Sequence, residues 1–234
     1  MKIEGSRSLV TGGSEGIGKA IAQGLVERGG KAAVLARRKD VLQRAAQEIG
    51  AVAIPGDVSQ EDDCVRAVQT AVRELGGLDV LVNNAGYGYF APLVEMDLAR
   101  FRDLYAVNVM GAMLMGREAA RYFLSRGGGG NIVNISSTSG TKGGRSSTAY
   151  ASSKFALKGM TECWREELRR HDVRVFLVNP SEVQTDFAGK AGHGQELSPK
   201  KLRGKEIADA VIGALEIDDR GFIPELSVFA TNPF

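Results

Sequence analysis

Two side chains able to exchange protons with a bound molecule, Tyr150 and Lys154, stand four residues apart in a segment with helical spacing. Residues at positions i and i+4 share a helix face, so the phenol and the ammonium can meet in one site. A phenol has a pKa of ~10, which a nearby positive charge lowers by stabilising the phenolate. The pair therefore predicts acid–base chemistry near neutral pH. By itself, a Tyr-x-x-x-Lys pattern is weak and normally marks a surface pair.

A glycine-rich loop stands where a predicted strand meets a predicted helix, in the order Thr11-Gly12-Gly13-Ser14-Glu15-Gly16-Ile17-Gly18. Glycine lets a backbone turn sharply and approach a pyrophosphate closely, because no Cβ intervenes. The helix start after Gly16 offers N–H groups and a positive dipole end to phosphates. The loop therefore predicts a dinucleotide site, with the spacing Gly-x-x-x-Gly-x-Gly instead of Gly-x-Gly-x-x-Gly.

A second interpretation of the same loop is a phosphate loop of the kind found in nucleotide hydrolases and kinases. Gly13 to Lys19 fits the pattern G-x-x-x-x-G-K. That motif needs Ser or Thr after the lysine to hold a magnesium ion. This chain has Ala20 at that position. Because Ala20 offers no oxygen, the phosphate-loop interpretation is disfavoured.

The end of the second predicted strand bears on which dinucleotide would bind. An acidic residue there would bond the adenosine ribose hydroxyls and repel a 2′-phosphate, but this chain has Arg37 and Arg38. Two guanidiniums favour a phosphate through charge-assisted hydrogen bonds; a solvated basic turn is the plain alternative. Glu15, within the glycine loop, points the other way. The residues favour NADP (NADPH) and leave NAD open.

These residues need a framework, and the chain alternates short β-branched runs with longer segments of three- and four-residue apolar spacing. The predicted strands are Ser8–Thr11, Ala32–Ala36, Val52–Pro55, Val80–Asn83, Ile132–Ser136 and Arg174–Asn179. The predicted helices are Ile17–Arg28, Val41–Ile49, Glu61–Leu75, Leu98–Leu124 and Ala151–Arg170. This order predicts a single α/β domain over residues 1–234, with a doubly wound parallel sheet and helices on both faces. Ligands of such sheets bind beyond the carboxyl ends of the strands.

Composition argues against several other classes of protein. The net charge is only +2, so nothing draws the chain strongly to nucleic acid or to a membrane surface. No stretch approaches the ~20 apolar residues of a transmembrane helix, and Met1–Val10 has no signal-like apolar run, so a cytoplasmic protein is expected. Cys64 and Cys163 predict free thiols. His171 and His193 are too isolated to predict a metal site.

Together, the motifs resemble the short-chain dehydrogenase/reductase family over most of the chain. The resemblance rests on an ordered set of residues: Thr11-Gly12-x-x-x-Gly16-Ile17-Gly18, Asp57-Val58, Asn83-Asn84-Ala85-Gly86, Asn108, Ser137, Tyr150-x-x-x-Lys154 and Pro180. It implies a Rossmann fold, hydride transfer between nicotinamide and a carbonyl carbon, and a catalytic tetrad of Asn108, Ser137, Tyr150 and Lys154. Ser137 is preferred to Ser136 because its thirteen-residue offset from Tyr150 looks like the family spacing.

The resemblance also implies the contacts of the cofactor. Asp57 and Val58 are expected at the adenine, and the segment after Pro180 at the nicotinamide amide. Ser181 departs from the glycine that usually follows this proline in the family. The expected cofactor-binding residues are Gly12, Ser14, Glu15, Gly16, Ile17, Gly18, Arg37, Arg38, Asp57, Val58, Asn83, Ala85, Gly86, Tyr150, Lys154, Pro180, Val183 and Thr185.

The expected substrate is a small-molecule carbonyl or alcohol, and a 3-oxoacyl thioester, a steroid, a sugar and a small ketone all stay open. Three segments are expected to shape its pocket: Tyr87–Phe90, Gly140–Thr148 and Ser181–Leu202. A loop as long as Ser181–Leu202 is often a lid or substrate loop, and a partly disordered segment is the alternative. Phe222–Phe229 predicts an edge strand, because Pro224 cannot donate to a ladder. Family members are commonly dimers or tetramers, and the apolar ending of the chain suggests burial at a subunit interface. A homodimer or homotetramer is therefore expected.

Two other functions compete with an NADP-dependent reductase. One is an NAD-dependent alcohol dehydrogenase, which differs only in the cofactor. The other is a nucleotide-binding sensor that keeps the fold without turnover. The complete tetrad argues against the sensor, because a protein that only binds a nucleotide has no need of Tyr150.

Overall fold

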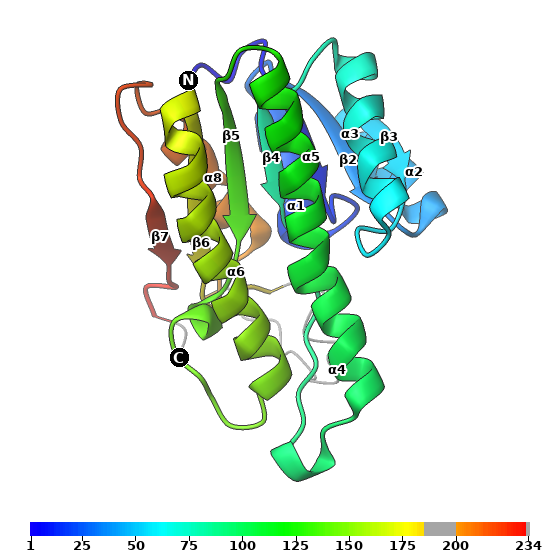
Figure 1. The fold of residues 1–234 in the computed structure, drawn as a ribbon, viewed down its shortest axis with the longest axis vertical. Coiled ribbons are helices and arrows are strands. Elements are labelled where there is room, and N and C mark those ends of the chain that lie inside the picture. Colours follow the sequence, from blue (N-terminus) through cyan, green and yellow to red (C-terminus); the bar gives the residue numbers. More distant parts are fainter. Residues whose placement is uncertain (185–199, 233–234) are drawn as a thin grey trace.

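The protein is built around a sheet of seven parallel strands, seen in a computed structural model that describes residues 1–184 and 200–232. The strand order is β3-β2-β1-β4-β5-β6-β7, and every neighbouring pair is parallel (Figure 1). The strands are β1 (Arg7–Thr11), β2 (Lys31–Ala36), β3 (Val52–Pro55), β4 (Val80–Asn83), β5 (Gly130–Ile135), β6 (Val173–Pro180) and β7 (Glu225–Val228). The order reverses direction between β1 and β4, which is where doubly wound sheets bind their ligands.

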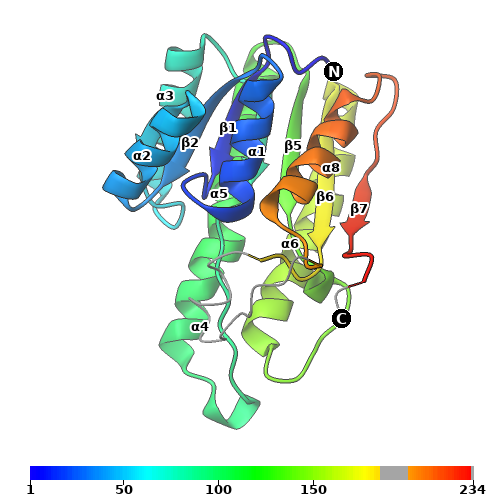
Figure 2. The ribbon, with the colours of Figure 1, turned by 180° about the vertical axis from the view of Figure 1, so that it is seen from behind.

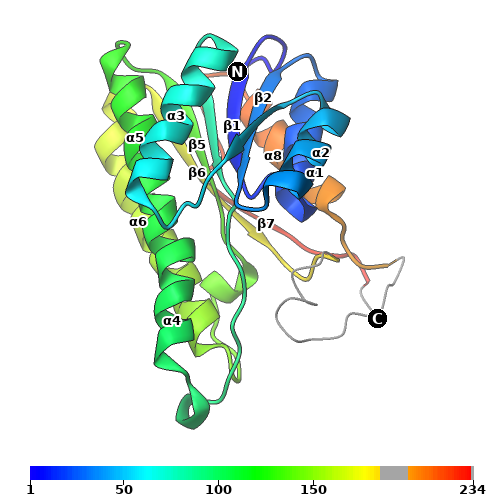
Figure 3. The same cartoon turned by 90° about the vertical axis from the view of Figure 1, so that its right-hand side faces the viewer.

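Helices cover both faces of the sheet, which confirms the predicted fold class. Seen edge-on, α3, α5 and α6 lie on one side of the sheet and α1, α2 and α8 on the other (Figure 3), and Figure 2 shows the second set from its own side. The helices are α1 (Gly16–Glu27), α2 (Lys39–Ile49), α3 (Glu61–Leu75), α4 (Leu98–Tyr105), α5 (Ala112–Ser125), α6 (Thr148–Leu168) and α8 (Gly204–Glu216). Short 3-10 turns occur at Leu93–Glu95, Thr138–Gly140 and Arg169–His171.

The alternation of side chains along each strand divides the apolar interior into two layers. In β1, Val10 packs in the layer of α1, α2 and α8, whereas Leu9 packs in the layer of α3, α5 and α6. Phe176 and Val175 divide in the same way on β6. Because both faces are covered, the strands are apolar on both sides, as parallel strands generally are.

The predicted single helix Leu98–Leu124 is continuous in the structure but not uniform. Between α4 and α5, residues Ala106–Gly111 form a π-helical segment. Such a segment adds a residue to a turn and is often found at functional sites. Asn108 lies within it and is buried.

One helix, α8, has no counterpart among the helices predicted from the sequence. Its buried residues Ile207, Val211 and Leu215 recur every four positions and pack in the α1 layer. The signal was therefore present in the sequence. At the sheet edge, β7 is shorter than the predicted Phe222–Phe229 and begins directly after Pro224. It pairs with β6 alone, as an edge strand does.

The packing on the α5 face gives a test of the fold. Phe123 is fully buried, and its ring fills the space beside the backbone of Gly130 at the start of β5. We expect Phe123→Ala to lower the free energy of unfolding by about 3 to 5 kcal/mol, the usual cost of truncating a buried aromatic side chain. Leu124, the next residue on the helix, is 41% exposed, and Leu124→Ala is the matched control. Urea unfolding of both variants measures the difference, and equal losses would contradict this packing.

Candidate active site

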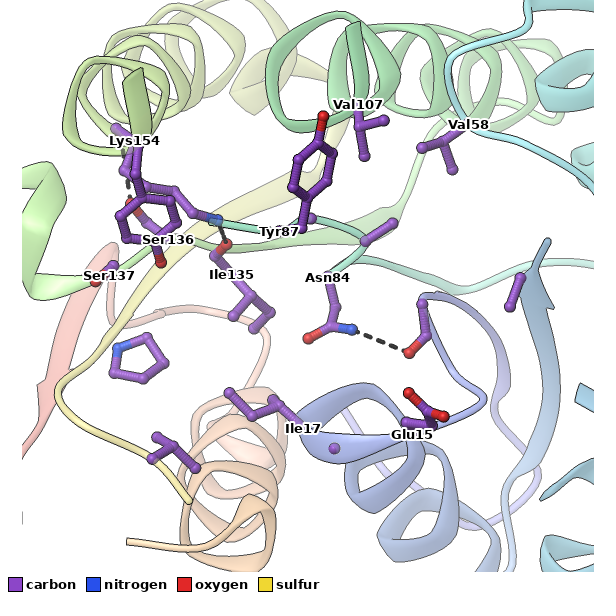
Figure 4. Close-up of a pocket in the computed structure, with 18 of the residues that line it drawn as sticks. Glu15, Ile17, Val58, Asn84, Tyr87, Val107, Ile135, Ser136, Ser137 and Lys154 are labelled. Atoms are coloured by element: carbon purple, nitrogen blue, oxygen red, sulfur yellow. Dashed lines mark hydrogen bonds between the residues drawn. The ribbon is translucent and has the colours of Figure 1, made fainter. Parts of the chain in front are cut away.

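A cavity of about 990 Å³ opens at the carboxyl ends of the strands. Its walls come from the glycine loop after β1, the ends of β2 and β3, the segments after β4, β5 and β6, and α6 (Figure 4). The cavity therefore lies where the sheet topology predicts ligand binding. Glu15 lies at one end of this view and Lys154 at the other.

The glycine loop is shaped by close contacts that only glycine permits. Gly12 has φ +65°, and a Cβ there would stand 2.9 Å from the side-chain nitrogen of Asn84. Gly18 is buried, and a Cβ on it would collide with the Gly12 carbonyl and the same amide. Gly16 has φ +55° and begins α1, whose first turn no side chain caps. The loop thus brings bare backbone and a helix N-terminus to the cavity wall, which suits a pyrophosphate.

Thr11 joins the glycine loop to the segment after β4. Its Oγ1 accepts hydrogen bonds from the backbone N–H groups of Asn84 and Ala85, both at 3.0 Å. In return, the Asn84 side chain donates to the Thr11 carbonyl at 3.0 Å and to the Gly12 carbonyl at 3.3 Å. These bonds fix two adjacent walls of the cavity to each other.

Two arginines stand at the end of β2, and each faces a carboxylate. Arg38 forms an ion pair with Glu15, and Nη1 of Arg37 lies 3.7 Å from Oδ2 of Asp57. All four residues line the cavity. This end of the cavity therefore carries two positive and two negative side chains, arranged as two ion pairs.

Tyr150, Ser137 and Lys154 meet at the other end of the cavity. The Ser137 side chain is hydrogen-bonded to the Tyr150 phenol, and Nζ of Lys154 lies 5.7 Å from the centre of the Tyr150 ring. Nζ of Lys154 donates to the Ile135 carbonyl at 2.9 Å, which is the dashed contact at the end of β5 in Figure 4. Ser136 bonds instead to the backbone carbonyl of Lys154, at 3.4 Å.

Burial dominates the titration of both groups. It lowers the pKa of Lys154 to about 8, because the residue is only 6% exposed and water stabilises its charge poorly. Burial also raises the pKa of Tyr150 above its usual value, while the hydrogen bond from Ser137 lowers it by less. The direction for Tyr150 is opposite to the sequence-based expectation, because desolvation of the phenolate outweighs its stabilisation.

Asn108 lies behind the cavity wall and does not itself line the cavity. Its Oδ1 accepts from the Tyr87 backbone N–H, and its Nδ2 donates to the Tyr87 carbonyl, each at 3.0 Å. Nδ2 also donates to Oγ of Ser153 at 3.1 Å. Asn108 therefore ties the π-helical segment to the loop after β4 and to the helix that carries Tyr150 and Lys154.

Most residues expected in the site do line the cavity. They are Gly12, Ser14, Glu15, Gly16, Ile17, Arg37, Arg38, Asp57, Val58, Ala85, Gly86, Ser137, Tyr150, Lys154, Pro180 and Val183. Gly18, Asn83 and Asn108 do not line it. Thr185 lies outside the described residues.

Asn83 is turned into the protein interior. Its Nδ2 donates to Oδ1 of Asn134 at 2.9 Å and to the Ala112 carbonyl at 3.2 Å. Its neighbour Asn84 lines the cavity instead. The Asn83 side chain is thus held inside the protein while that of Asn84 faces the cavity, because successive residues at a strand end face opposite ways.

The cavity also contains residues that the expected site omitted. They are Leu35, Ala36, Gly56, Asn84, Val107, Ile135, Ser136, Thr138 and Ser139. Most lie at or directly beyond a strand end, and this position was the signal available in the sequence. Of the segments expected to shape a substrate pocket, Tyr87 and Phe90 line the cavity, whereas no residue of Gly140–Thr148 does. Ser181, Glu182 and Val183 of the expected loop Ser181–Leu202 also line it, and most of that loop lies outside the described residues.

The residues present fit a nicotinamide dinucleotide. The bare backbone at Gly12 and the uncapped start of α1 suit the phosphates, and Arg37 and Arg38 suit a further phosphate. Tyr150 and Lys154 supply a titratable pair within the same cavity. The lining thus changes along its length, from bare backbone and arginines at one end to the Tyr150 and Lys154 pair at the other.

Comparison with known proteins gives the family. The family model described as short chain dehydrogenase matches residues 7–196. The chain belongs to this family. It is therefore a member of an oxidoreductase family. The resemblance that its motifs indicated is confirmed.

Named relatives match nearly the whole chain. 3beta-hydroxysteroid dehydrogenase 2 of Eggerthella lenta is 35% identical over 238 residues, which cover 94% of this chain and 91% of that protein. Carbonyl reductase family member 4 of Danio rerio is 33% identical over 218 residues, which cover 89% of this chain and 90% of that protein. The matches therefore extend through both ends of the cavity.

Solved structures share the fold as well. A short chain dehydrogenase from Burkholderia cenocepacia in complex with NADP superposes with a TM-score of 0.87 at 28% identity, covering 98% of each chain. An alcohol dehydrogenase from Thermococcus sibiricus, complexed with 5-hydroxy-NADP, gives a TM-score of 0.86 at 28% identity, covering 97% of each chain. Within residues 1–184 and 200–232, no helix has the length and apolar character that crossing a membrane requires.

The buried lysine gives a prediction on stability. Its pKa is 10.5 without burial and about 8 in the folded protein. Between these values the unfolded chain binds more protons at Lys154 than the folded protein does, so stability rises with pH across this window. Relative to Lys154→Met, we expect the wild type to gain up to about 3 kcal/mol, at ~1.4 kcal/mol per pKa unit.

Urea unfolding across that pH window measures the gain. Lys158→Met is the control, since this side chain is on the next helical turn but is 31% exposed. Parallel pH profiles for the wild type and Lys154→Met would contradict burial as the cause.

Proposed function

We propose that this protein is an NADP-dependent oxidoreductase that transfers a hydride between nicotinamide and a carbonyl or alcohol substrate. The observation that carries the proposal is the meeting of Ser137, Tyr150 and Lys154 in the same cavity as the glycine loop. A bound nicotinamide would supply or accept the hydride. The chain's own residues then have to handle the proton and hold the substrate oxygen.

Tyr150 is the proton donor and acceptor in this proposal. Because burial raises its pKa, the phenol is protonated at neutral pH and suited to give a proton to a carbonyl oxygen as that oxygen becomes an alcohol. Ser137 bonds the phenol and stands where it can also bond the substrate oxygen. In the reverse direction, the alcohol proton returns to Tyr150.

Lys154 and Asn108 support Tyr150. With a pKa of about 8, Lys154 is mostly charged at neutral pH, and its ammonium favours the phenolate that forms when Tyr150 gives up its proton. Asn108 holds the helix of Tyr150 and Lys154 against the loop after β4. Its role in the tetrad is thus to position the proton-transfer groups.

The preference for NADP is supported by Arg37 and Arg38 at the cavity wall. The solved relatives from Burkholderia cenocepacia and Thermococcus sibiricus were crystallised with NADP and 5-hydroxy-NADP. NAD is the alternative, and Glu15 is the residue that favours it. A nucleotide-binding sensor without turnover is a weaker alternative, since such a protein has no reaction in which Tyr150 and Lys154 would transfer a proton.

We further propose that residues 1–234 act as one domain and that the protein forms a homodimer or homotetramer. The exposed apolar side chains of Met110, Phe155 and Phe229 are compatible with subunit contacts.

The compartment and the substrate are separate questions. Cys64 and Cys163 are both free thiols, which suits a protein of the cytoplasm. A steroid, a small ketone, a sugar and a 3-oxoacyl thioester stay open as substrates; the Eggerthella lenta relative is named for a hydroxysteroid.

The proton-transfer role is tested by Tyr150→Phe, which removes one oxygen from the site. We expect turnover of a carbonyl substrate to fall at least about hundredfold, because general acid catalysis contributes at least that factor. NADPH binding should be kept, since the ring and its packing remain. Tyr122→Phe, outside the cavity lining, is the control. Wild-type turnover by Tyr150→Phe would rule out the proposed mechanism.

The cofactor preference is tested by replacing both cavity arginines. We expect Arg37→Ala plus Arg38→Ala to weaken NADPH binding far more than NADH binding, because only NADPH carries the 2′-phosphate. Arg66→Ala plus Arg73→Ala removes the same charge from exposed positions on α3 and is the control. Titration calorimetry with both cofactors gives the two dissociation constants. Equal losses for NADPH and NADH would remove the case for phosphate recognition.

A further inference from the structure

The two arginines at the end of β2 are not equivalent. The Arg38 guanidinium is in direct contact with the Glu15 carboxylate, through a hydrogen-bonded ion pair between Nη2 and Oε1. Arg37 lies 3.7 Å from the Asp57 carboxylate, which is beyond hydrogen-bonding distance. Across residues 1–184 and 200–232, no side-chain hydrogen bond holds Arg37. Arg38 is thus committed to an internal anion, whereas Arg37 keeps its donors available.

The Asp57 carboxylate is itself held in place by its own turn. Its Oδ1 accepts hydrogen bonds from the backbone N–H and the hydroxyl of Ser59, both at 2.9 Å. Asp57 therefore cannot swing toward Arg37 without breaking this turn. Glu15 has a longer side chain and reaches Arg38 from the glycine loop after β1, the strand next to β2.

We propose that Glu15 sets the ratio of NADPH to NADH affinity by competing with the 2′-phosphate for Arg38, and that Arg37 is the principal phosphate ligand. The inference rests on the proposed dinucleotide function and refines its cofactor specificity. A 2′-phosphate that approaches Arg38 has to displace the Glu15 carboxylate and remain next to its negative charge. The ribose of NADH has two neutral hydroxyls instead, and a carboxylate can accept hydrogen bonds from them.

This arrangement makes the preference for NADP adjustable by one side chain. The Glu15 carboxylate offsets the Arg38 charge in direct contact, whereas Asp57, at 3.7 Å, offsets the Arg37 charge without occupying its hydrogen-bond donors. The direct hydrogen bonds to a phosphate therefore come from Arg37. Removing the Glu15 charge releases Arg38 as a second phosphate ligand. The site is then more selective for NADPH than the wild type.

The test is Glu15→Gln, measured as the dissociation constants of NADPH and NADH by titration calorimetry on the full chain. We expect NADPH to bind about tenfold more tightly, the effect of one added charge-assisted hydrogen bond. NADH should bind equally well or more weakly. Glu48→Gln is the matched control: Glu48 pairs with Lys19 of α1 in the same kind of ion pair, but it does not line the cavity.

The arginine variants separate the two routes by which Glu15 could act. Arg37→Gln should weaken NADPH binding more than Arg38→Gln does. In the Arg38→Gln background, Glu15→Gln should change NADPH affinity by less than it does in the wild type, because Arg38 is no longer there to release. Thermal unfolding of each variant verifies that it is folded.

Several results would overturn the inference. They are an equal change for both cofactors in Glu15→Gln, no change at all, a full effect in the Arg38→Gln background, or a larger loss from Arg38→Gln than from Arg37→Gln. Failure of the proposed function has a different signature, because the wild-type protein would then bind neither NADPH nor NADH. A wild type that binds NADPH, with a Glu15→Gln variant that lacks selectivity, would refute this inference alone.

Discussion

The buried ammonium of Lys154 constrains how the elements around the cavity pack, because it needs a hydrogen-bond partner inside the protein. Taking a charge out of water costs several kcal/mol unless it is well bonded, and Nζ of Lys154 has the Ile135 carbonyl at 2.9 Å as its partner. That bond requires the end of β5 to lie against α6. The Asn108 amide also holds the loop after β4 against α6, because it donates hydrogen bonds to the Tyr87 carbonyl in that loop and to the Ser153 hydroxyl on α6. The burial that makes this packing necessary also lowers the pKa of Lys154 and raises that of Tyr150.

The other end of the cavity is governed by backbone shape and by charge. Glycines let the loop after β1 approach the segment after β4 so closely that a Cβ at Gly12 would meet Asn84 at 2.9 Å. Charge is supplied there by two arginines, and it is partly cancelled by Glu15 and Asp57. The fold thus separates the end of the cavity with the glycine loop and the two arginines from the end with Tyr150 and Lys154, and the sheet joins them. This division follows from the reversal of strand order between β1 and β4.

The sequence predicts the sheet, the strand ends and the helices of both layers except α8, because β-branched runs and helical spacing act locally. It does not distinguish Asn83 from Asn84, since only the register of β4 decides which of two adjacent amides faces the cavity. It also misses the direction of the Tyr150 pKa, which depends on how completely α6 and the loops exclude water. The π-helical segment around Asn108 depends in the same way on tertiary contacts with Tyr87 and Ser153. Features that arise between distant segments are the ones that the sequence pattern leaves undetermined.

The central claim is that this cavity moves a hydride while Tyr150 moves the proton. The most direct measurement uses NADPH carrying deuterium at the transferable position of the nicotinamide, a carbonyl substrate found by screening, and mass spectrometry of the product. The account predicts an alcohol with one deuterium on the former carbonyl carbon and a solvent-exchangeable hydrogen on its oxygen. Reduced product without deuterium on that carbon would contradict it.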